Sequence, residues 1–251
     1  MARFTRYRRD SGESFALGAF AVIELLRARP ELVTQLWIRP DFRGDRRELD
    51  RLCRQCGVVP LEGERPFSIL SPKENIYVLA QFRKAESYLD SRRDHVVLVE
   101  PSDMGNLGTI LRTAAGFGIR NVAIIGDGAD FWNPKVVRAS MGAAFHVNIR
   151  RFPTVEDYRK AAGERRYCCF MLDGQETLEQ ADFSGACARS FVFGNEASGL
   201  PESYRALGQS IRIEHSARID SLNLSIAVGI ALYRATAFDI ADKLGYDKQY
   251  Q

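Results

Sequence analysis

Short apolar runs that look like strands alternate with helical stretches along the second half of the chain. The expected strands cover residues 96–100, 122–125, 145–149, 167–172, 190–193 and 211–213. Helical patterns at residues 107–117 and 155–162 separate some of these strands. Strands that alternate with helices favour a parallel sheet covered by helices on both faces. The sequence therefore predicts an α/β fold for this half of the chain.

The front half carries the pattern of a second, smaller α/β unit. We expect helices at residues 14–29 and 45–57, and strands at residues 36–38, 76–82 and from residue 58 onward. The charged stretch 83–94 is typical of a linker. We therefore expect an N-terminal domain at residues 1–88 and a second domain at residues 89–251.

Composition excludes several classes of protein. The chain has 251 residues, of which 45% are hydrophobic and 27% charged, as expected for a globular protein. It lacks an apolar stretch of membrane-spanning length, and no apolar signal core follows the basic N-terminus. The five cysteines form no regular disulfide framework, which favours a reducing, cytoplasmic compartment. Cys53-x-x-Cys56 lacks a second ligand pair and the three histidines lack metal-ligand spacing, so no metal is expected.

Charge is distributed unevenly along the chain. Residues 1–93 hold 18 Lys and Arg against 13 Asp and Glu, a net charge of +5. Residues 94–251 hold 17 against 19, a net charge of −2. A basic front half suggests that it captures a polyanion such as RNA. The alternative is that the arginines only solvate helix faces, and charge alone does not separate the two.

The end of the chain combines a polar step with a long apolar helix. Ser221-Leu-Asn-Leu-Ser225 opens a helix that is apolar enough to be almost wholly buried. Asp220 or Ser221 can cap it by accepting a hydrogen bond from a free N–H group of the first turn. Buried polar groups without partners are costly, so either other protein groups or a ligand must satisfy these side chains.

Two further segments stand out. Residues 105–118 start a helix directly after the first strand of the second half, with Arg112 about one turn in. Residues 191–201 run from a strand into a turn bracketed by Gly194 and Gly199, where the backbone can come close to a ligand. Each segment alone is a weak signal. The chain lacks the dinucleotide-binding loop G-x-G-x-x-G, the P-loop and the G-x-S-x-G elbow.

Together and in this order, the three segments resemble the motifs of the SpoU/TrmH family of SPOUT-class RNA methyltransferases. The motifs are matched by Asn106-x-Gly108-x-Ile110-x-Arg112-Thr113-Ala114, by Gly194-Asn195-Glu196-x-x-Gly199-Leu200 and by Ser221-Leu222-Asn223-Leu224-Ser225. The resemblance covers roughly residues 94–240. The front half resembles, more loosely, a ribosomal-protein-type RNA-binding domain.

The resemblance implies transfer of a methyl group from S-adenosylmethionine to a ribose 2′-hydroxyl of ribosomal or transfer RNA, with ribosomal RNA slightly favoured. It also implies a deep trefoil knot in the C-terminal domain, a rare exception to unknotted chains. A homodimer would form through the last helix and bring Arg112 of one subunit toward the cofactor of the other. The residues implied for cofactor binding are Gly194, Asn195, Gly199, Ile213 and Leu222.

The resemblance also assigns catalytic roles. The family gives removal of the hydroxyl proton to the arginine of the first motif, here Arg112. Because arginine stays protonated, binding the neighbouring phosphate and stabilising the developing alkoxide is a physically easier role. Asn106 and Asn223 would orient the ribose or Arg112, Glu196 would fix the arginine or the cofactor loop, and Ser221 would bind cofactor or substrate.

Two other functions remain as alternatives. The first is a non-catalytic RNA-binding module with the same fold, which the basic front half supports. The five intact motif residues argue against it, because a decayed enzyme would have lost some of them. The second is a nucleotide-dependent oxidoreductase, which the missing dinucleotide loop disfavours.

Overall fold

Two sheets organise the chain, and each belongs to its own compact unit. The computed structural model describes residues 6–70 and 75–243, with the side chains of the last helix described up to Thr236. The first unit contains the chain up to residue 87, together with residues 103–112 and 129–148. The second contains residues 88–102, 113–128 and those from 149 onward. These units do not coincide with the expected domains at residues 1–88 and 89–251, because residues 103–112 and 129–148 pack with the front of the chain.

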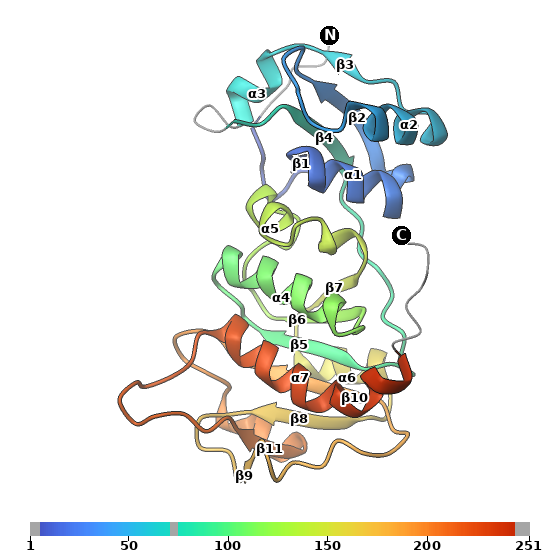
Figure 1. Ribbon diagram of the computed structural model, residues 1–251. Helices are drawn as coiled ribbons and strands as arrows, with labels where there is room; N and C mark the ends of the chain where they lie inside the picture. Colours follow the sequence, from blue (N-terminus) through green and yellow to red (C-terminus); the bar gives the residue numbers. More distant parts are fainter. Residues whose placement is uncertain (1–5, 71–74, 244–251) are drawn as a thin grey trace. The chain divides into compact units, whose positions relative to one another are not determined.

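The first unit is built on a four-stranded sheet of order β1-β4-β2-β3 (Figure 1). Strand β4 pairs antiparallel with both β1 and β2, and β3 pairs parallel with β2. The elements of the front part are β1 (Glu13–Leu17), α1 (Ala19–Ala28), η1 (Pro30–Leu32), β2 (Val33–Ile38), α2 (Arg46–Cys56), β3 (Leu61–Glu62), α3 (Arg65–Leu70) and β4 (Val78–Arg83).

Two expectations for this region are wrong. Residues 14–17 were expected in a helix but lie in β1, because Gly18, with φ of 97°, separates a strand from the helix that follows. Phe15 and Ala16 are buried and β1 pairs with β4 along its length, so tertiary packing overrides the helical pattern. The strand expected from residue 58 begins only at Leu61.

Helix α2 forms where its capping residues predict it. The Asp45 carboxylate accepts a hydrogen bond from the Glu48 N–H at 2.9 Å, and Gly57 ends the helix in the left-handed conformation. Cys53 is buried on the inner face of α2, and burial raises the pKa of its thiol to about 11. This position fits an ordinary buried thiol, and no cluster of three or more metal-ligating side chains occurs in the described part of the chain.

Two later segments complete the first unit. Residues 103–112 carry most of helix α4 (Met104–Gly116), and residues 129–148 include α5 (Pro134–Ala139) and η2 (Ala143–Phe145). The ring of Phe82 from β4 meets Trp132 and Phe145 edge-on, with centroids 5.4 and 5.1 Å apart. The Trp132 indole N–H also donates to the Ala85 carbonyl at 2.9 Å. Aromatic packing therefore fixes residues 129–148 to the first sheet.

The second unit is built on a seven-stranded sheet of order β7-β6-β5-β10-β8-β11-β9. Its ladders β6–β5, β5–β10, β10–β8, β8–β11 and β11–β9 are all parallel, which confirms the predicted parallel sheet. The remaining elements are β5 (His95–Val99), β6 (Asn121–Ile125), β7 (Asn148–Phe152), α6 (Val155–Ala162), β8 (Arg166–Phe170), β9 (Glu176–Thr177), β10 (Arg189–Phe193), η3 (Glu202–Leu207), β11 (Gln209–Arg212) and α7 (Leu224–Lys243). Strand β7 starts later than expected, because residues 143–145 form the short helix η2.

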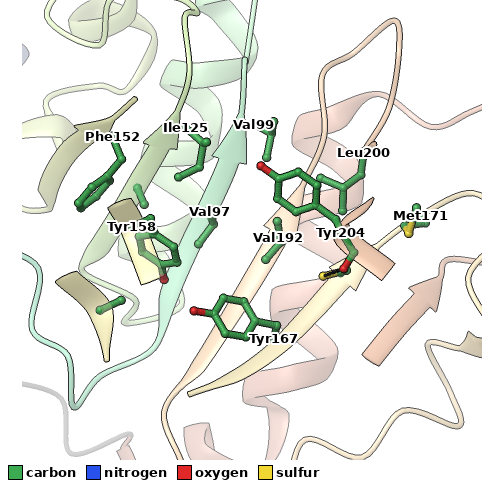
Figure 2. Packing of buried hydrophobic residues seen from close by; sticks show 13 residues of the cluster. Val97, Val99, Ile125, Phe152, Tyr158, Tyr167, Met171, Val192, Leu200 and Tyr204 are labelled. Carbon is green, nitrogen blue, oxygen red and sulfur yellow. Dashed lines mark hydrogen bonds between the residues drawn. The ribbon is translucent and has the colours of Figure 1, made fainter. Parts of the chain in front are cut away.

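One face of this sheet carries a core rich in tyrosine (Figure 2). Val97 from β5 and Val192 from β10 lie among Tyr158 from α6, Tyr167 from β8 and Tyr204 from η3. Strands β5, β6 and β10 are buried along their whole length, as expected of central strands covered on both faces. This rigid centre positions the loops at the strand ends.

Helix α7 is less buried than its composition predicts. Val228, Ala231, Leu232 and Ala235 are buried, with at most 4% of each residue exposed. Ile226, Ile230 and Tyr233 repeat every three to four residues and are 54%, 38% and 65% exposed. The expectation of an almost wholly buried helix is therefore wrong for the single chain, which leaves an apolar stripe in contact with solvent. Among the described helices, none is both long and apolar enough to cross a membrane.

Candidate functional site

A cavity of about 190 Å³ lies in the second unit, at the carboxyl ends of three parallel strands. Its walls come from the loops that follow β8, β10 and β11 and from the start of α7. The lining residues are Phe170, Met171, Leu172, Phe193, Gly194, Asn195, Glu196, Ala197, Ser198, Gly199, Leu200, Ile211, Ile213, His215, Ser221, Leu222, Leu224 and Ala227. Open α/β sheets commonly bind ligands at this edge, because loops from neighbouring strands meet there.

The turn after β10 closes one side of the cavity. Asn195 and Gly199 exchange two backbone hydrogen bonds, of 3.1 and 2.9 Å, and Gly199 has φ of 69°. A Cβ atom on Gly194 would lie 2.1 Å from the Gly199 carbonyl carbon and 2.2 Å from the Leu200 nitrogen. Only glycine fits at residue 194 without moving this backbone. The glycines of the motif therefore serve the shape of the turn.

Side chains of the same turn bind the loop that follows β5. The Asn195 amide donates to the Glu100 carbonyl at 2.7 Å. Glu196 Oε2 accepts hydrogen bonds from the Ser102 N–H at 2.9 Å and from the Ser102 hydroxyl at 2.8 Å. Glu100 has φ of 49°, which a residue with a side chain rarely adopts. Hydrogen bonds thus hold the loops after β5 and β10 together, and one of them is accepted by the strained residue Glu100.

Apolar side chains form the rest of the cavity wall. The rings of Phe170 and Phe193 stack with centroids 4.5 Å apart and an angle of 4° between their planes. Ile213 and Leu222 are half-buried and face the cavity, while Ser221 is exposed at its edge. The cavity therefore offers flat apolar surfaces next to backbone polar groups.

Asn223 caps helix α7, in place of the expected Asp220 or Ser221. Its Oδ1 accepts hydrogen bonds from the N–H of Ser225 at 2.9 Å and from the Ser225 hydroxyl at 2.7 Å. The earlier expectation for the cap is wrong, because the helix begins at Leu224. Asn223 is not among the residues that line the cavity, whereas Ser221 is.

Asn106 and Arg112 belong to the first unit, where both lie on α4. The Asn106 N–H donates to Asp103 Oδ1 at 2.7 Å, which fixes the first turn of this helix. The Arg112 side chain is exposed, and within the described part of the chain it forms no hydrogen bond or salt bridge. The cavity itself brings together seven of the predicted site residues: Gly194, Asn195, Glu196, Gly199, Ile213, Ser221 and Leu222.

Comparison with known proteins identifies this arrangement. The sequence model of the SpoU rRNA methylase family matches residues 94–233, more than half of the chain. The chain belongs to the SpoU rRNA methylase family. The matched region contains all three sequence motifs, the cavity and the parallel sheet.

Curated relatives of this SpoU-family chain differ in how much of their length is shared. A tRNA/rRNA methyltransferase of Synechocystis sp., described as uncharacterized, is 32% identical over 144 residues, which are 56% of this chain and 52% of that protein. The chain thus spans about half the length of this relative. The 23S rRNA (guanosine(2553)-2′-O)-methyltransferase RlmP of Bacillus subtilis is 25% identical over 237 residues, 91% of each protein.

Solved structures of similar proteins extend the likeness to both units of the chain. The AdoMet-bound rRNA methyltransferase of Sinorhizobium meliloti has a TM-score of 0.76 and 29% identity, over 90% of this chain and 88% of that one. The SpoU methyltransferase AviRb of Streptomyces viridochromogenes, solved with AdoMet, has a TM-score of 0.75 over 92% of each chain. Its 23% identity supports the shared fold alone.

Two residues of this SpoU-family site are not predicted by the sequence motifs. Ser102 lies outside the three motifs, and nothing in its local sequence indicates that it binds Glu196 across 94 positions of the chain. The three histidines were considered only as metal ligands, for which their spacing does not fit, yet His215 lines the cavity. Its place just after β11, in a loop leading to a motif, was the available signal.

Proposed function

We propose that this chain transfers a methyl group from S-adenosylmethionine to a ribose 2′-hydroxyl of RNA, with ribosomal RNA favoured over transfer RNA. The observation that carries the proposal is the cavity at the strand ends, closed by the turn at Gly194 and Gly199 and edged by Ser221. Family membership and the named 23S rRNA 2′-O-methyltransferase of Bacillus subtilis support the same activity.

The residues of the cavity fit this cofactor. Leu222 and Ile213 offer apolar surface for the faces of an adenine ring. Its polar edges can bind the Gly194 backbone and the carbonyl oxygens of Asn195 and Gly199, which can each accept a second hydrogen bond. Gly194, Asn195 and Gly199 all line the cavity, so a ligand there meets backbone as well as side chains. The cofactor supplies a methyl group already activated by a sulfonium, so the reaction requires no metal.

The remaining motif residues orient the substrate. Arg112 binds the phosphate next to the reacting ribose and stabilises negative charge on its oxygen, which its exposure permits. Ser221 donates or accepts a hydrogen bond at the cavity edge, and Asn106 and Asn223 orient the ribose or Arg112. Glu196 acts through Ser102, because their hydrogen bonds hold the turn that closes the cavity.

Residues 89–251 form the catalytic domain, which contains a deep trefoil knot, and residues 1–88 form the RNA-binding domain. Membership of the SpoU rRNA methylase family supports the knot. The net charge of +5 in residues 1–93 supports RNA binding by the front domain. An RNA substrate and the unpaired thiols support a cytoplasmic location.

The protein works as a homodimer that pairs through α7. The stripe of Ile226, Ile230 and Tyr233 supports this assembly, because a second copy would remove three large apolar side chains from water. In the dimer, Arg112 of one subunit serves the cofactor of the other.

The activity is tested by two measurements on the purified protein. Isothermal titration should show binding of S-adenosylhomocysteine, and labelled S-adenosylmethionine should transfer its methyl group to the ribose 2′-oxygen of cellular RNA. Binding without transfer to any RNA would favour the non-catalytic RNA-binding module. Absence of binding would contradict the assigned cofactor.

Arg112→Ala tests the assignment of the substrate residues. Loss of an electrostatic group at a developing charge lowers kcat by about 100- to 1,000-fold. The dissociation constant of S-adenosylhomocysteine should stay within about twofold of wild type, because Arg112 does not line the cavity. Arg120→Ala, another exposed arginine outside the motifs, is the matched control and should keep the wild-type rate. Equal loss of binding and transfer in a folded Arg112→Ala protein would contradict the role.

A further inference from the structure

We propose that His215 accepts the proton of the ribose 2′-hydroxyl during methyl transfer; the inference rests on the function proposed above. His215 lies in the loop after β11 and lines the cavity together with Glu196 and Ser221. None of the three sequence motifs contains it. Its role therefore follows from its position and its hydrogen bonding.

One hydrogen bond fixes the protonation pattern of the ring. Nδ1 of His215 lies 2.9 Å from the carbonyl oxygen of Ile213. A carbonyl oxygen only accepts hydrogen bonds, so Nδ1 carries the proton in the neutral ring. Nε2 is then the nitrogen with the free electron pair. The ring is exposed, and among the described residues none is hydrogen-bonded to Nε2.

The other polar groups at the site suit this step less well. Glu196, the second titratable residue in the cavity wall, already accepts two hydrogen bonds from Ser102. Arg112 stays protonated and therefore lacks an electron pair to offer. Among side chains, an imidazole is the one that ordinarily exchanges a proton near neutral pH. His215 is thus the cavity residue whose chemistry matches a proton acceptor.

The charges around His215 are of both signs. Besides Glu196 on the turn after β10, its own loop carries Glu214, Arg218 and Asp220, and Glu214 forms an ion pair of 3.6 Å with Arg212. Acidic and basic residues both lie close to His215 in the sequence, so the charges of its loop are neither all positive nor all negative.

The proposed step balances as follows. The 2′-oxygen forms a bond to the methyl carbon while its proton passes to Nε2 of His215. The bond between that carbon and the sulfonium sulfur breaks, and its electron pair stays on sulfur. The products are the 2′-O-methyl ribose, S-adenosylhomocysteine and an imidazolium, which then gives its proton to water.

The test is a pH–rate profile of His215→Asn with saturating cofactor, between pH 5 and 9. Asparagine keeps a donor for the Ile213 carbonyl but lacks the base. We expect kcat to fall about 100-fold, within the range for general base catalysis, and the acid limb of the profile to disappear. The dissociation constant of S-adenosylhomocysteine should stay within about twofold of wild type. Glu214→Gln, a neighbour outside the cavity wall, is the control and should retain both the rate and the acid limb.

Chemical rescue provides a second readout. His215→Ala leaves room at an exposed position, so added imidazole should restore a concentration-dependent part of the rate. A folded His215→Asn protein with wild-type rate and profile would overturn the proposal while leaving the methyltransferase activity intact. Equal loss of cofactor binding and rate, without rescue, would overturn it in favour of a cofactor-binding role. Failure of the wild type to bind cofactor would remove the proposed function itself.

Discussion

The two ends of the parallel sheet use polar residues in opposite ways. At the amino ends of β5 and β10, the side chains of His95, Tyr158 and Ser190 are completely buried. Tyr158 Oη lies 2.9 Å from His95 Nδ1 and 2.6 Å from Ser190 Oγ, and His95 Nε2 lies 2.9 Å from the Asp90 carbonyl. At the carboxyl ends, Ser221 and His215 are exposed at the edge of a cavity.

This difference separates a structural network from a binding site. Each hydrogen bond of the His95 network is closed within the protein, so it fixes the core without a ligand. The Asp90 carbonyl only accepts, so Nε2 of His95 carries a proton, and in the neutral ring Nδ1 accepts from the Tyr158 hydroxyl. Burial, and secondarily the charge of Arg165, lowers the pKa of His95 to about 4. Of the two histidines, only His215 can reach solvent or substrate.

Acid should destabilise the amino-end network most strongly. In the unfolded chain His95 titrates near pH 6.5, whereas in the folded chain it stays neutral down to about pH 4. Between these values the unfolded state binds more protons, so the free energy of unfolding falls as the pH drops. His95 alone accounts for a loss on the order of 3 kcal/mol by pH 4. Urea unfolding at a series of pH values measures this slope, and an NMR titration midpoint of His95 near pH 6.5 would contradict it.

Gly194→Ala should damage the carboxyl end and spare the amino end. The added Cβ would displace the backbone of Gly199, and such overpacking costs about 1–3 kcal/mol. We expect the dissociation constant of S-adenosylhomocysteine to rise by about tenfold to 100-fold. Gly116→Ala at the end of α4 is the matched control and should bind normally, because a Cβ there meets no atom within 4 Å and Gly116 does not line the cavity. Unchanged binding by a folded Gly194→Ala protein would argue against this turn as part of the cofactor site.

Tyr158→Phe should have the reverse effect. Removing the hydroxyl leaves His95 Nδ1 and Ser190 Oγ buried without their shared partner, which lowers the free energy of unfolding by about 1–2 kcal/mol. The kcat of methyl transfer should stay within about twofold of wild type at a temperature where the variant is folded. Chemical denaturation and a rate assay measure the two effects. A large loss of kcat without loss of stability would contradict a purely structural role for the network at the amino ends of the strands.

Local sequence patterns predict the second unit better than the first. Continuous apolar runs identify β5, β6 and β10, because central strands of a parallel sheet are buried on both faces. The run before Gly18 fits a helix equally well, and only pairing with β4 makes it strand β1. The exposed stripe of α7 could not be predicted from composition, which does not say how much of a helix one chain covers.

Some residues of the candidate site can likewise be predicted from local sequence, and others cannot. Gly194, Asn195, Gly199 and Leu222 were found because motif spacing preserves a turn and a helix start. Ser102 and His215 belong to no motif, and they join the site only when separate strands end at one edge of the sheet. Long-range packing decides such contacts. For Ser102 the sequence holds no local signal, and for His215 the signal is its place in a loop that leads to a motif.

The discontinuous first unit has a consequence for synthesis on the ribosome. Phe82 of β4 packs against Trp132 and Phe145, and the Ser14 hydroxyl binds the Trp132 carbonyl. These partners leave the exit tunnel well after β4, so the emerging front sheet lacks part of its core until residue 148 is free. Nascent chains that end before residue 148 expose aromatic surface to which chaperones can bind. The front unit therefore cannot mature first, although it is translated first.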